Sequence, residues 1–363
     1  MFETSIERIL ERVEAVDPLE YARTRNFTGG AVTRLSPYIS RGVISPKRIL
    51  DTVRRKKYEL YRIEKFVQEL AWREYFQNVW QAQNIDEDVR QPQPDVKNLQ
   101  MPKTLLDAAT GIEAIDDAIN DLYEKGYIHN HLRMYVASIA CNIGRSHWKI
   151  PAKWFYYHLL DADWASNALS WQWTAGAFSN KKYYANQENI NKYCAGEQRG
   201  TFLDVEYAEF PDLPVPEVLR ETENPVLQTI LPKKAAIEID AALPTLVYNF
   251  YNLDPFWKAD AKANRVLLLE PTHFEKYPVS AKTLDFVLQL AENIAGIKIY
   301  TGEFDELKTE HNLSELHFKE HPTNSHYAGF EEPRDWMFPE IKGYFPSFFG
   351  YWKKCEKLLK AKN

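Results

Sequence analysis

The sequence is poor in cysteine, and the three cysteines lie far apart along its 363 residues: Cys141, Cys194 and Cys355. This spacing supplies neither a disulfide framework nor the paired ligands of a zinc site. No uninterrupted apolar run of about 18 residues occurs, so we expect no transmembrane helix. The first 17 residues form a charged amphipathic pattern that lacks the apolar stretch of a signal peptide. We therefore expect a cytoplasmic protein that does not bind a membrane.

Basic residues do not predominate either, because the net charge is −6. This charge argues mildly against a nucleic-acid partner, although a local basic stripe would matter more than the total. The second half contains neither GxGxxG nor GxxxxGK[ST], so nucleotide binding by that half is unsupported. Aromatic residues are abundant, at 14% of the chain with ten Trp. They favour a protein that stacks on a flat ligand, although packing alone also uses such rings.

The length predicts two domains, and the pattern changes near residue 206. Helical patterns cover residues 5–16 and 61–80, and Ser45 precedes Pro46 as a helix cap. We expect an all-α domain over residues 1–205, a Pro-rich linker over 206–232 and a smaller α/β domain over 233–363. The α/β prediction depends on four strand-like runs, AAIEID, PTLVYNFY, RVLLLE and IKIYTG. The helical run SAKTLDFVLQLAENIA lies between the last two, which predicts a mostly parallel sheet.

The segment over residues 126–173 places polar side chains where helices usually carry an apolar stripe. Spacings of three and four put Asn130, Arg133 and Met134 on one helix face. Further along, Asp161 and Asp163 precede another helical run, and this run contains the polar residue Asn167. The residues therefore predict a polar cavity inside a helical bundle.

A second polar region comes earlier, where a glycine-bearing loop over residues 21–30 leads to Thr33-Arg34-Leu35-Ser36 before a helix. Backbone amides, hydroxyls and an arginine at a helix start are the components of an anion site. The alternative is an ordinary helix cap made by a hydroxyl side chain.

Six motifs in order make this chain resemble the FAD-binding domain of the photolyase and cryptochrome superfamily over residues 20–195. They are VTRLSPYISRGVISP, ELAWREYF, the TG at Thr110, HNHLRM, DAD and NALSWQW. The resemblance implies an all-α cavity that holds FAD, with Asn167 opposite flavin N5 and no metal. The implied FAD-binding residues are Tyr21, Thr33, Arg34, Leu35, Ser36, Phe66, Arg73, Asn130, Arg133, Asp161, Asp163 and Asn167.

The resemblance also implies roles in catalysis. Five residues match positions that line the pocket for a flipped pyrimidine dimer: Glu69, Trp72, Asn130, Met134 and Trp173. Trp171 and Trp148 match the first two members of an electron-transfer chain. The usual third tryptophan is missing, and Trp80, Trp154, Trp164 or a tyrosine is expected to replace it. Four basic residues are expected to follow the phosphate backbone of DNA: Arg41, Lys47, Lys181 and Lys182.

The domain order is inverted relative to ordinary photolyases, because the α/β segment follows the FAD motifs. This order resembles the bacterial photolyase subgroup with inverted topology called NewPHL. The resemblance implies a monomeric carbon–carbon lyase that splits cyclobutane pyrimidine dimers, preferably in single-stranded DNA, by electron transfer from excited reduced FAD. It implies no iron–sulfur cluster, because only three cysteines exist. The alternatives are a cryptochrome-like blue-light receptor without repair activity, a (6-4) photolyase, and a flavin-free helical DNA-binding or scaffolding protein.

Overall fold

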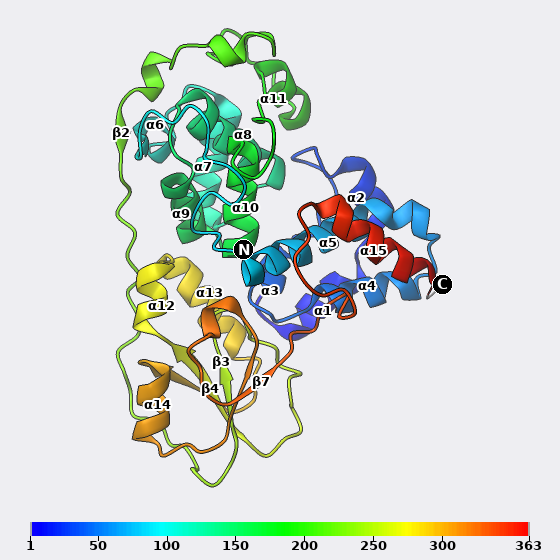
Figure 1. Cartoon of the computed structure of the whole chain (residues 1–363), viewed down its shortest axis with the longest axis vertical. Helices are drawn as coiled ribbons and strands as arrows, with labels where there is room; N and C mark the ends of the chain where they lie inside the picture. Colours follow the sequence, from blue (N-terminus) through cyan, green and yellow to red (C-terminus); the bar gives the residue numbers. More distant parts are fainter. Residues whose placement is uncertain (1, 362–363) are drawn as a thin grey trace. The chain divides into compact units, whose positions relative to one another are not determined.

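The computed structural model describes residues 2–361, and the chain divides into two compact units (Figure 1). Unit 1 comprises Met1–Pro18, Thr33–Gln81 and Gln228–Asn363, whereas unit 2 comprises Leu19–Val32 and Ala82–Leu227. The domain expected over residues 1–205 therefore contributes to both units, and the domain boundaries stay a prediction. The architecture of helices plus a parallel sheet confirms the expected α and α/β fold class. Within residues 2–361, every helix is too short or too polar to cross a membrane.

Unit 2 is mostly helical. Its main helices are α6 (Lys103–Leu106), α7 (Glu113–Lys125), α8 (Asn130–Ser138), α9 (Lys149–His158), α10 (Trp164–Ala175) and α11 (Gln187–Cys194), and α2 (Pro18–Thr24) precedes them in the chain. A π-helical stretch, Ile139–Ile143, continues α8, and α10 packs against both α8 and α9. Two short strands, β1 (Met101–Pro102) and β2 (Thr222–Glu223), pair antiparallel and fix the linker region to this unit.

The helical part of unit 1 confirms the predicted opening and long helices. It consists of α1 (Ile6–Glu14), α3 (Ser36–Ser40), α4 (Pro46–Arg55), α5 (Leu60–Ala82) and α15 (Phe348–Ala361). Ser45 caps α4 as predicted, because its hydroxyl accepts a hydrogen bond from the amide of Arg48 at 3.1 Å. The helix α3 has only five residues, so its dipole contributes little to an anion site at its start.

The rest of unit 1 is built on a five-stranded sheet whose strands are all parallel. The strands are β3 (Thr245–Tyr248), β4 (Asn264–Leu269), β5 (Ile297–Thr301), β6 (Leu316–Lys319) and β7 (Phe330–Glu332), in the order β5-β4-β3-β6-β7. The connecting helices are α12 (Pro271–Lys276), α13 (Ala281–Ala291) and α14 (Phe304–Glu310). Three of the predicted strands and the intervening helix are confirmed. The strand predicted at AAIEID is wrong, since residues 235–240 form no strand.

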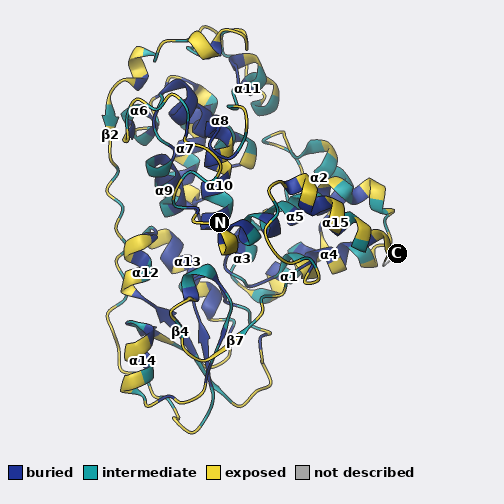
Figure 2. Ribbon diagram, viewed as in Figure 1, coloured by how far each residue is buried: buried dark blue, intermediate teal, exposed yellow. Residues whose placement is uncertain are grey.

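The inner strands β3 and β4 of the sheet consist mostly of buried residues (Figure 2). One core cluster joins alternate strand residues to Phe304 and Leu307 of α14, which therefore covers one face of the sheet. Ile237 and Ile239 pack against this cluster. The apolar pattern of residues 235–240 thus reflects contact with the core rather than a strand.

Candidate functional site

In unit 2, an ion pair joins α8 to the loop before α10. Arg133 Nη2 lies 3.0 Å from Asp161 Oδ2, and Arg133 Nε donates to the carbonyl of Ile128 at 2.9 Å. Asp161 is buried and Arg133 is partly exposed. Two hydrogen bonds hold the guanidinium in place, so the pair is a fixed charged group on the face of α8 that the sequence predicted.

Polar side chains also surround the start of α10. Asp163 caps this helix, because its Oδ1 accepts from the amide of Ser166 at 2.7 Å. One turn further, Asn167 Nδ2 donates to the carbonyl of Ala152 on α9 at 2.7 Å. The hydroxyl of Ser166 is buried and, within residues 2–361, has no hydrogen-bond partner. Such a group normally requires a partner, so it indicates a place for an external polar group.

The first turn of α8 carries the other predicted residues of this segment. Asn130 is exposed at the first position of the helix and Met134 is half-buried one turn later. His129 caps the helix, since its Nδ1 accepts from the amide of His131 at 3.2 Å. His131 Nδ1 lies 2.8 Å from the carbonyl of Asn26, and burial lowers the pKa of this imidazole. Both histidines therefore hold local structure.

The buried tryptophans of unit 2 contact other aromatic rings. Trp171 is buried, and its ring lies 5.1 Å from that of Phe155. Trp148 is buried 6.3 Å from Trp164, between ring centroids. Three tryptophans were expected as candidates for the third member of the electron-transfer chain. Of these, Trp164 lies beside Trp148. Trp173 is exposed at the other predicted position in α10.

Trp154 and Trp80, the other two candidates, have different surroundings. Trp154 lies 5.0 Å from Phe155, between ring centroids, and so connects through that ring to the neighbourhood of Trp171. Trp80 belongs to unit 1, where it contacts Tyr251 and His321.

In unit 1, the predicted anion loop has an unusual backbone at Arg34. This exposed residue has φ of 53°, in the left-handed region. Left-handed residues turn successive amides toward one side, which is the geometry of an anion-binding nest. Leu35 is buried and anchors the loop, and Thr33 and Ser36 are partly exposed beside it. Tyr21, predicted to act with this loop, lies in α2 of unit 2.

The helix α5 carries the remaining predicted residues. Phe66 is buried, Glu69 and Trp72 are half-buried at spacings of three, and Arg73 donates to the hydroxyl of Ser40. The spacing places Phe66, Glu69 and Trp72 along one side of the helix. The structure therefore assembles the predicted residues of α5 as one set, separately from those of unit 2.

One functional neighbour of this set was missed in the sequence. Phe348, at the start of α15, stacks on Trp72 with 3.7 Å between ring centroids and 9° between the planes. Glu74 anchors the same C-terminal segment: its carboxylate accepts from the amides of Met337 and Phe338, at 2.6 and 2.9 Å, and from Tyr351 Oη at 2.8 Å. The sequence did contain a signal for Glu74. This acid follows Leu70 and Ala71 by one helical turn, which places it on the buried face of α5.

The basic residues predicted to contact DNA require correction. Arg41 is 0% exposed, and its guanidinium carbon lies 3.5 Å from the centroid of the Phe250 ring. The side chain of Lys182 is 11% exposed and pairs with Asp95 at 2.7 Å. The prediction is therefore wrong for Arg41 and Lys182, whose charges are used inside the fold. Lys47 pairs with Asp335 at 3.1 Å, and Lys181 is exposed.

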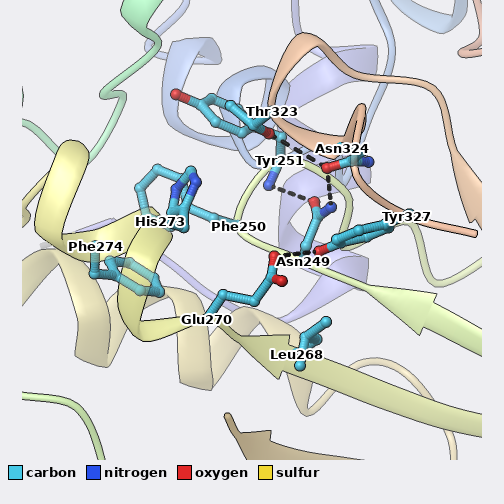
Figure 3. Close-up of a pocket in the computed structure, with 10 residues that line it drawn as sticks. All are labelled: Asn249, Phe250, Tyr251, Leu268, Glu270, His273, Phe274, Thr323, Asn324 and Tyr327. Carbon is cyan, nitrogen blue, oxygen red and sulfur yellow. Dashed lines mark hydrogen bonds between the residues drawn. The ribbon is translucent and has the colours of Figure 1, made fainter. Parts of the chain in front are cut away.

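A small pocket, with a cavity volume of about 10 Å³, lies at the C-terminal ends of β3 and β4 (Figure 3). Ligands of open parallel sheets often bind at this edge. Here four polar side chains bond one another: Asn249 donates to Asn324 at 3.0 Å and Tyr327 donates to Glu270 at 2.7 Å. His273 Nε2 is buried and has no hydrogen-bond partner within residues 2–361. Ordinary ligand pockets have roughly 300–1,000 Å³. The smaller volume and the internal bonds favour a structural cluster that joins the ends of the strands.

Comparison with known proteins supports the reading of the helical motifs. Residues 66–240 match the family described as the FAD binding domain of DNA photolyase. Over these residues the chain is similar to the FAD-binding domain of the photolyase and cryptochrome superfamily. FAD is the cofactor of this photolyase-type domain. The expected superfamily is thus confirmed, and the NewPHL subgroup stays a prediction.

Two curated relatives illustrate the extent of the similarity. The chain is 26% identical over 201 residues to a deoxyribodipyrimidine photo-lyase of Alkalihalophilus pseudofirmus, covering 53% of this chain and 42% of that protein. It is 32% identical over 212 residues to an Ostreococcus tauri protein, Cryptochrome DASH, chloroplastic/mitochondrial, covering 53% and 37%. The chain therefore spans less than half the length of these relatives.

A solved structure, the cryptochrome of Synechocystis sp. PCC6803, matches with a TM-score of 0.47 and 24% sequence identity. The match covers 60% of this chain and 48% of that one.

The residues of the photolyase-type domain fit FAD. In unit 2, the donor set comprises the Arg133 guanidinium, fixed by Asp161, and the buried Ser166 hydroxyl beside Asn167. In unit 1, the loop at Arg34 offers backbone amides and a cation suited to a diphosphate. These are the polar and charged groups that a flavin and a diphosphate require.

Proposed function

We propose that the protein is a light-dependent DNA photolyase that splits cyclobutane pyrimidine dimers, preferably in single-stranded DNA. The observation that carries this proposal is the set of Glu69 and Trp72 on one side of α5. This set provides a carboxyl group and a flat indole within residues 66–240, the segment that matches the FAD-binding family. A flipped dimer requires both an apolar wall and a polar group at its carbonyls.

FAD, when bound, reduced and excited by light, supplies the electron that opens the cyclobutane ring and receives it again afterwards. The residues of the chain position the reactants. In unit 1, Trp72 is proposed to stack on a flipped base and Glu69 to hydrogen-bond a dimer carbonyl. In unit 2, Trp173 is proposed for stacking and Asn130 for hydrogen bonding. Met134 provides an adaptable apolar surface. Arg73 and Phe66 of unit 1 are each proposed to contact the cofactor, as is Asp163 of unit 2. Trp171 and Trp148 of unit 2 are proposed as the route for electrons to oxidised cofactor.

The nearest alternatives are less well supported. Repair of the (6-4) lesion generally uses a histidine pair, and here His129 and His131 are engaged as a helix cap and in a contact with Asn26. A light receptor without repair activity is favoured by the similarity to Cryptochrome DASH of Ostreococcus tauri. The residues Glu69, Met134 and Asn167 favour repair instead.

The test uses FAD-loaded, photoreduced protein and an oligonucleotide that contains one cyclobutane thymine dimer. Repair is measured under blue light on single-stranded and double-stranded forms, with a sample kept in the dark as control. We expect repair only in the light and faster on the single strand. FAD binding without repair of either form would contradict the proposal and direct the next assay to the (6-4) lesion. Colourless protein that does not take up FAD would support a flavin-free DNA-binding protein.

A further inference from the structure

The exposed side of α15 carries an unusual concentration of positive charge for a chain with net charge −6. Four of its lysines are exposed: Lys353, Lys354, Lys357 and Lys360. The helix has one acid, Glu356, and this acid pairs with Lys360 at 2.5 Å. Lys353 and Lys357 share a face about 6 Å apart along the axis.

Some other lysines of unit 1 are engaged in ion pairs. Lys234 pairs with Glu310 at 2.5 Å, and Lys258 pairs with Glu332 at 2.6 Å. Among the described residues, Lys353, Lys354 and Lys357 have no ion pair. The helix dipole favours cations in the last turn, but Lys353 is only the sixth residue of α15. Its charge is therefore not explained by stabilisation of the helix end.

An exposed aromatic ring lies at the N-terminal end of the same side. Phe349 is 70% exposed and precedes Lys353 by one helical turn. Its neighbour Phe348 is 3% exposed and stacks on Trp72. The stack holds the first turn of α15 against α5, so the exposed ring and the lysines have a fixed position beside Trp72.

We propose that the exposed side of α15 binds single-stranded nucleic acid, with Lys353, Lys354 and Lys357 on the phosphates and Phe349 stacked on a base. This inference rests on the proposed function, because it assigns the element that receives the DNA strand next to Trp72. Single-strand binders combine a basic track with aromatic rings that accept unpaired bases. A duplex offers phosphates but no free base face for Phe349.

The opposite side of α15 argues against a lipid surface as the partner. Helices that lie on membranes insert their apolar face into the bilayer. In α15 this face is already buried within unit 1, through Phe348, Tyr351, Trp352, Cys355 and Leu359. Phe349 is exposed and Leu358 is partly exposed, which is little apolar surface for insertion, whereas the lysines are placed for an anionic polymer.

The experiment measures binding of FAD-loaded protein to fluorescent oligothymidine in the dark, across a range of salt concentrations. The test variant reverses three charges of α15, K353E, K354E and K357E. The control variant reverses three exposed lysines elsewhere in unit 1, K233E, K262E and K282E. Both variants change the net charge equally, so only the position of the charge differs. Thermal unfolding and FAD content establish that both variants are folded.

At low salt we expect the α15 variant to bind at least tenfold more weakly, and the control within twofold of the wild type. The salt slope, log K against log[salt], should become shallower by roughly 2 in the α15 variant, since each lost phosphate contact on a single strand removes about 0.7. F349A should weaken binding roughly tenfold without changing the slope, because a stacked base contributes about 1–3 kcal/mol.

Equal loss in both variants, or loss in neither, would overturn the inference. So would unchanged DNA binding together with lost binding to phosphatidylserine vesicles, which would identify a lipid surface. Repair assays separate this inference from the proposed function. If the wild type repairs dimers and the α15 variant binds like the control, only this inference fails. If the wild type repairs nothing but the α15 variant loses DNA binding, only the proposed function fails.

Discussion

Phe348 lies flat on Trp72, with 3.7 Å between ring centroids, 9° between planes and the ring of Phe348 almost fully buried. This is the arrangement in which an aromatic side chain receives a base. The C-terminal segment therefore covers one face of the ring that the proposed function assigns to the lesion, and a base uses the other face or displaces Phe348.

The first prediction concerns the strength of this contact. Phe348→Ala removes a buried ring and should lower the free energy of unfolding by about 3–5 kcal/mol. Phe349→Ala, one residue later on the exposed side, should change it by less than about 0.5 kcal/mol. Urea denaturation measures both, and limited proteolysis should cut α15 faster in the first variant only. Equal stability of the two variants would mean that the stack contributes nothing to holding α15.

Glu74 gives a prediction about pH. Burial raises the pKa of this carboxyl, although hydrogen bonds from Met337 and Tyr351 oppose the change. A folded-state pKa above the unfolded value means that the folded protein binds more protons, so stability falls as pH rises through the folded pKa. Thermal unfolding of the wild type should therefore show lower stability as pH rises above about 4.5, the ordinary value for Glu. Glu74→Gln should lack this pH-dependent decrease in stability. It should also be less stable at every pH, because the amide nitrogen of Gln cannot accept a hydrogen bond from a backbone amide.

The ion pair of Arg133 and Asp161 should support retention of FAD. Asp161→Asn leaves the guanidinium without its counter-charge, and we expect FAD binding to weaken about ten- to a hundredfold, which corresponds to about 1.4–2.7 kcal/mol. Asp121→Asn is the matched control, since Asp121 pairs with Lys125 at 2.6 Å on the exposed surface. Flavin absorbance after dialysis measures retention, and comparable losses from both variants would show that the buried pair has no special role.

The aromatic contacts of unit 2 predict the third member of the electron-transfer chain. The ring of Trp164 lies 6.3 Å from Trp148, so Trp164→Phe should slow photoreduction of bound FAD at least tenfold while FAD content stays unchanged. Trp154→Phe is the comparison, because Trp154 contacts Phe155 instead. Time-resolved flavin absorbance distinguishes them. A slower reaction in the Trp154 variant alone would assign the route through Phe155.

Glu69 is predicted to act on the lesion rather than on the fold. Glu69→Ala should lose most repair while retaining FAD, since the carboxyl is proposed to bond the dimer carbonyls. Glu64→Ala, on the same helix, should repair like the wild type. Single-turnover repair of photoreduced protein is the measurement, and wild-type rates in the Glu69 variant would remove this residue from the proposed site.

The sequence predicted helices best where capping and periodicity agreed. Ser45 with Pro46 predicted the start of α4, and the apolar period over residues 61–80 predicted α5. It failed at residues 235–240, where alternating Ile237 and Ile239 pack on the core without strand partners. The strands β6 and β7 were missed because short strands depend on neighbours that are distant in the sequence.

For the candidate site, the order of the family motifs along the sequence was a better guide than the charge of single residues. The Arg133–Asp161 pair spans 28 residues, and only the family resemblance indicated that both residues belong to the candidate site. Charge alone misplaced Arg41 and Lys182, because a formal charge does not reveal a ring or an acid that will cover it. Phe348 was not found because no local pattern indicates contact with a residue 276 positions away.

The hydrogen bond between Glu74 and Met337 joins residues that are 263 positions apart, and this separation affects how the chain is made. Ribosomes add about 5–20 residues per second, so Glu74 is synthesised roughly 13–53 s before Met337. The larger segment of unit 2, Ala82–Leu227, emerges during that interval, and its other segment, Leu19–Val32, precedes α5. Unit 2 can therefore fold while Trp72 and Glu74 are still uncovered, and newly made α5 is the part of the protein that most needs a chaperone.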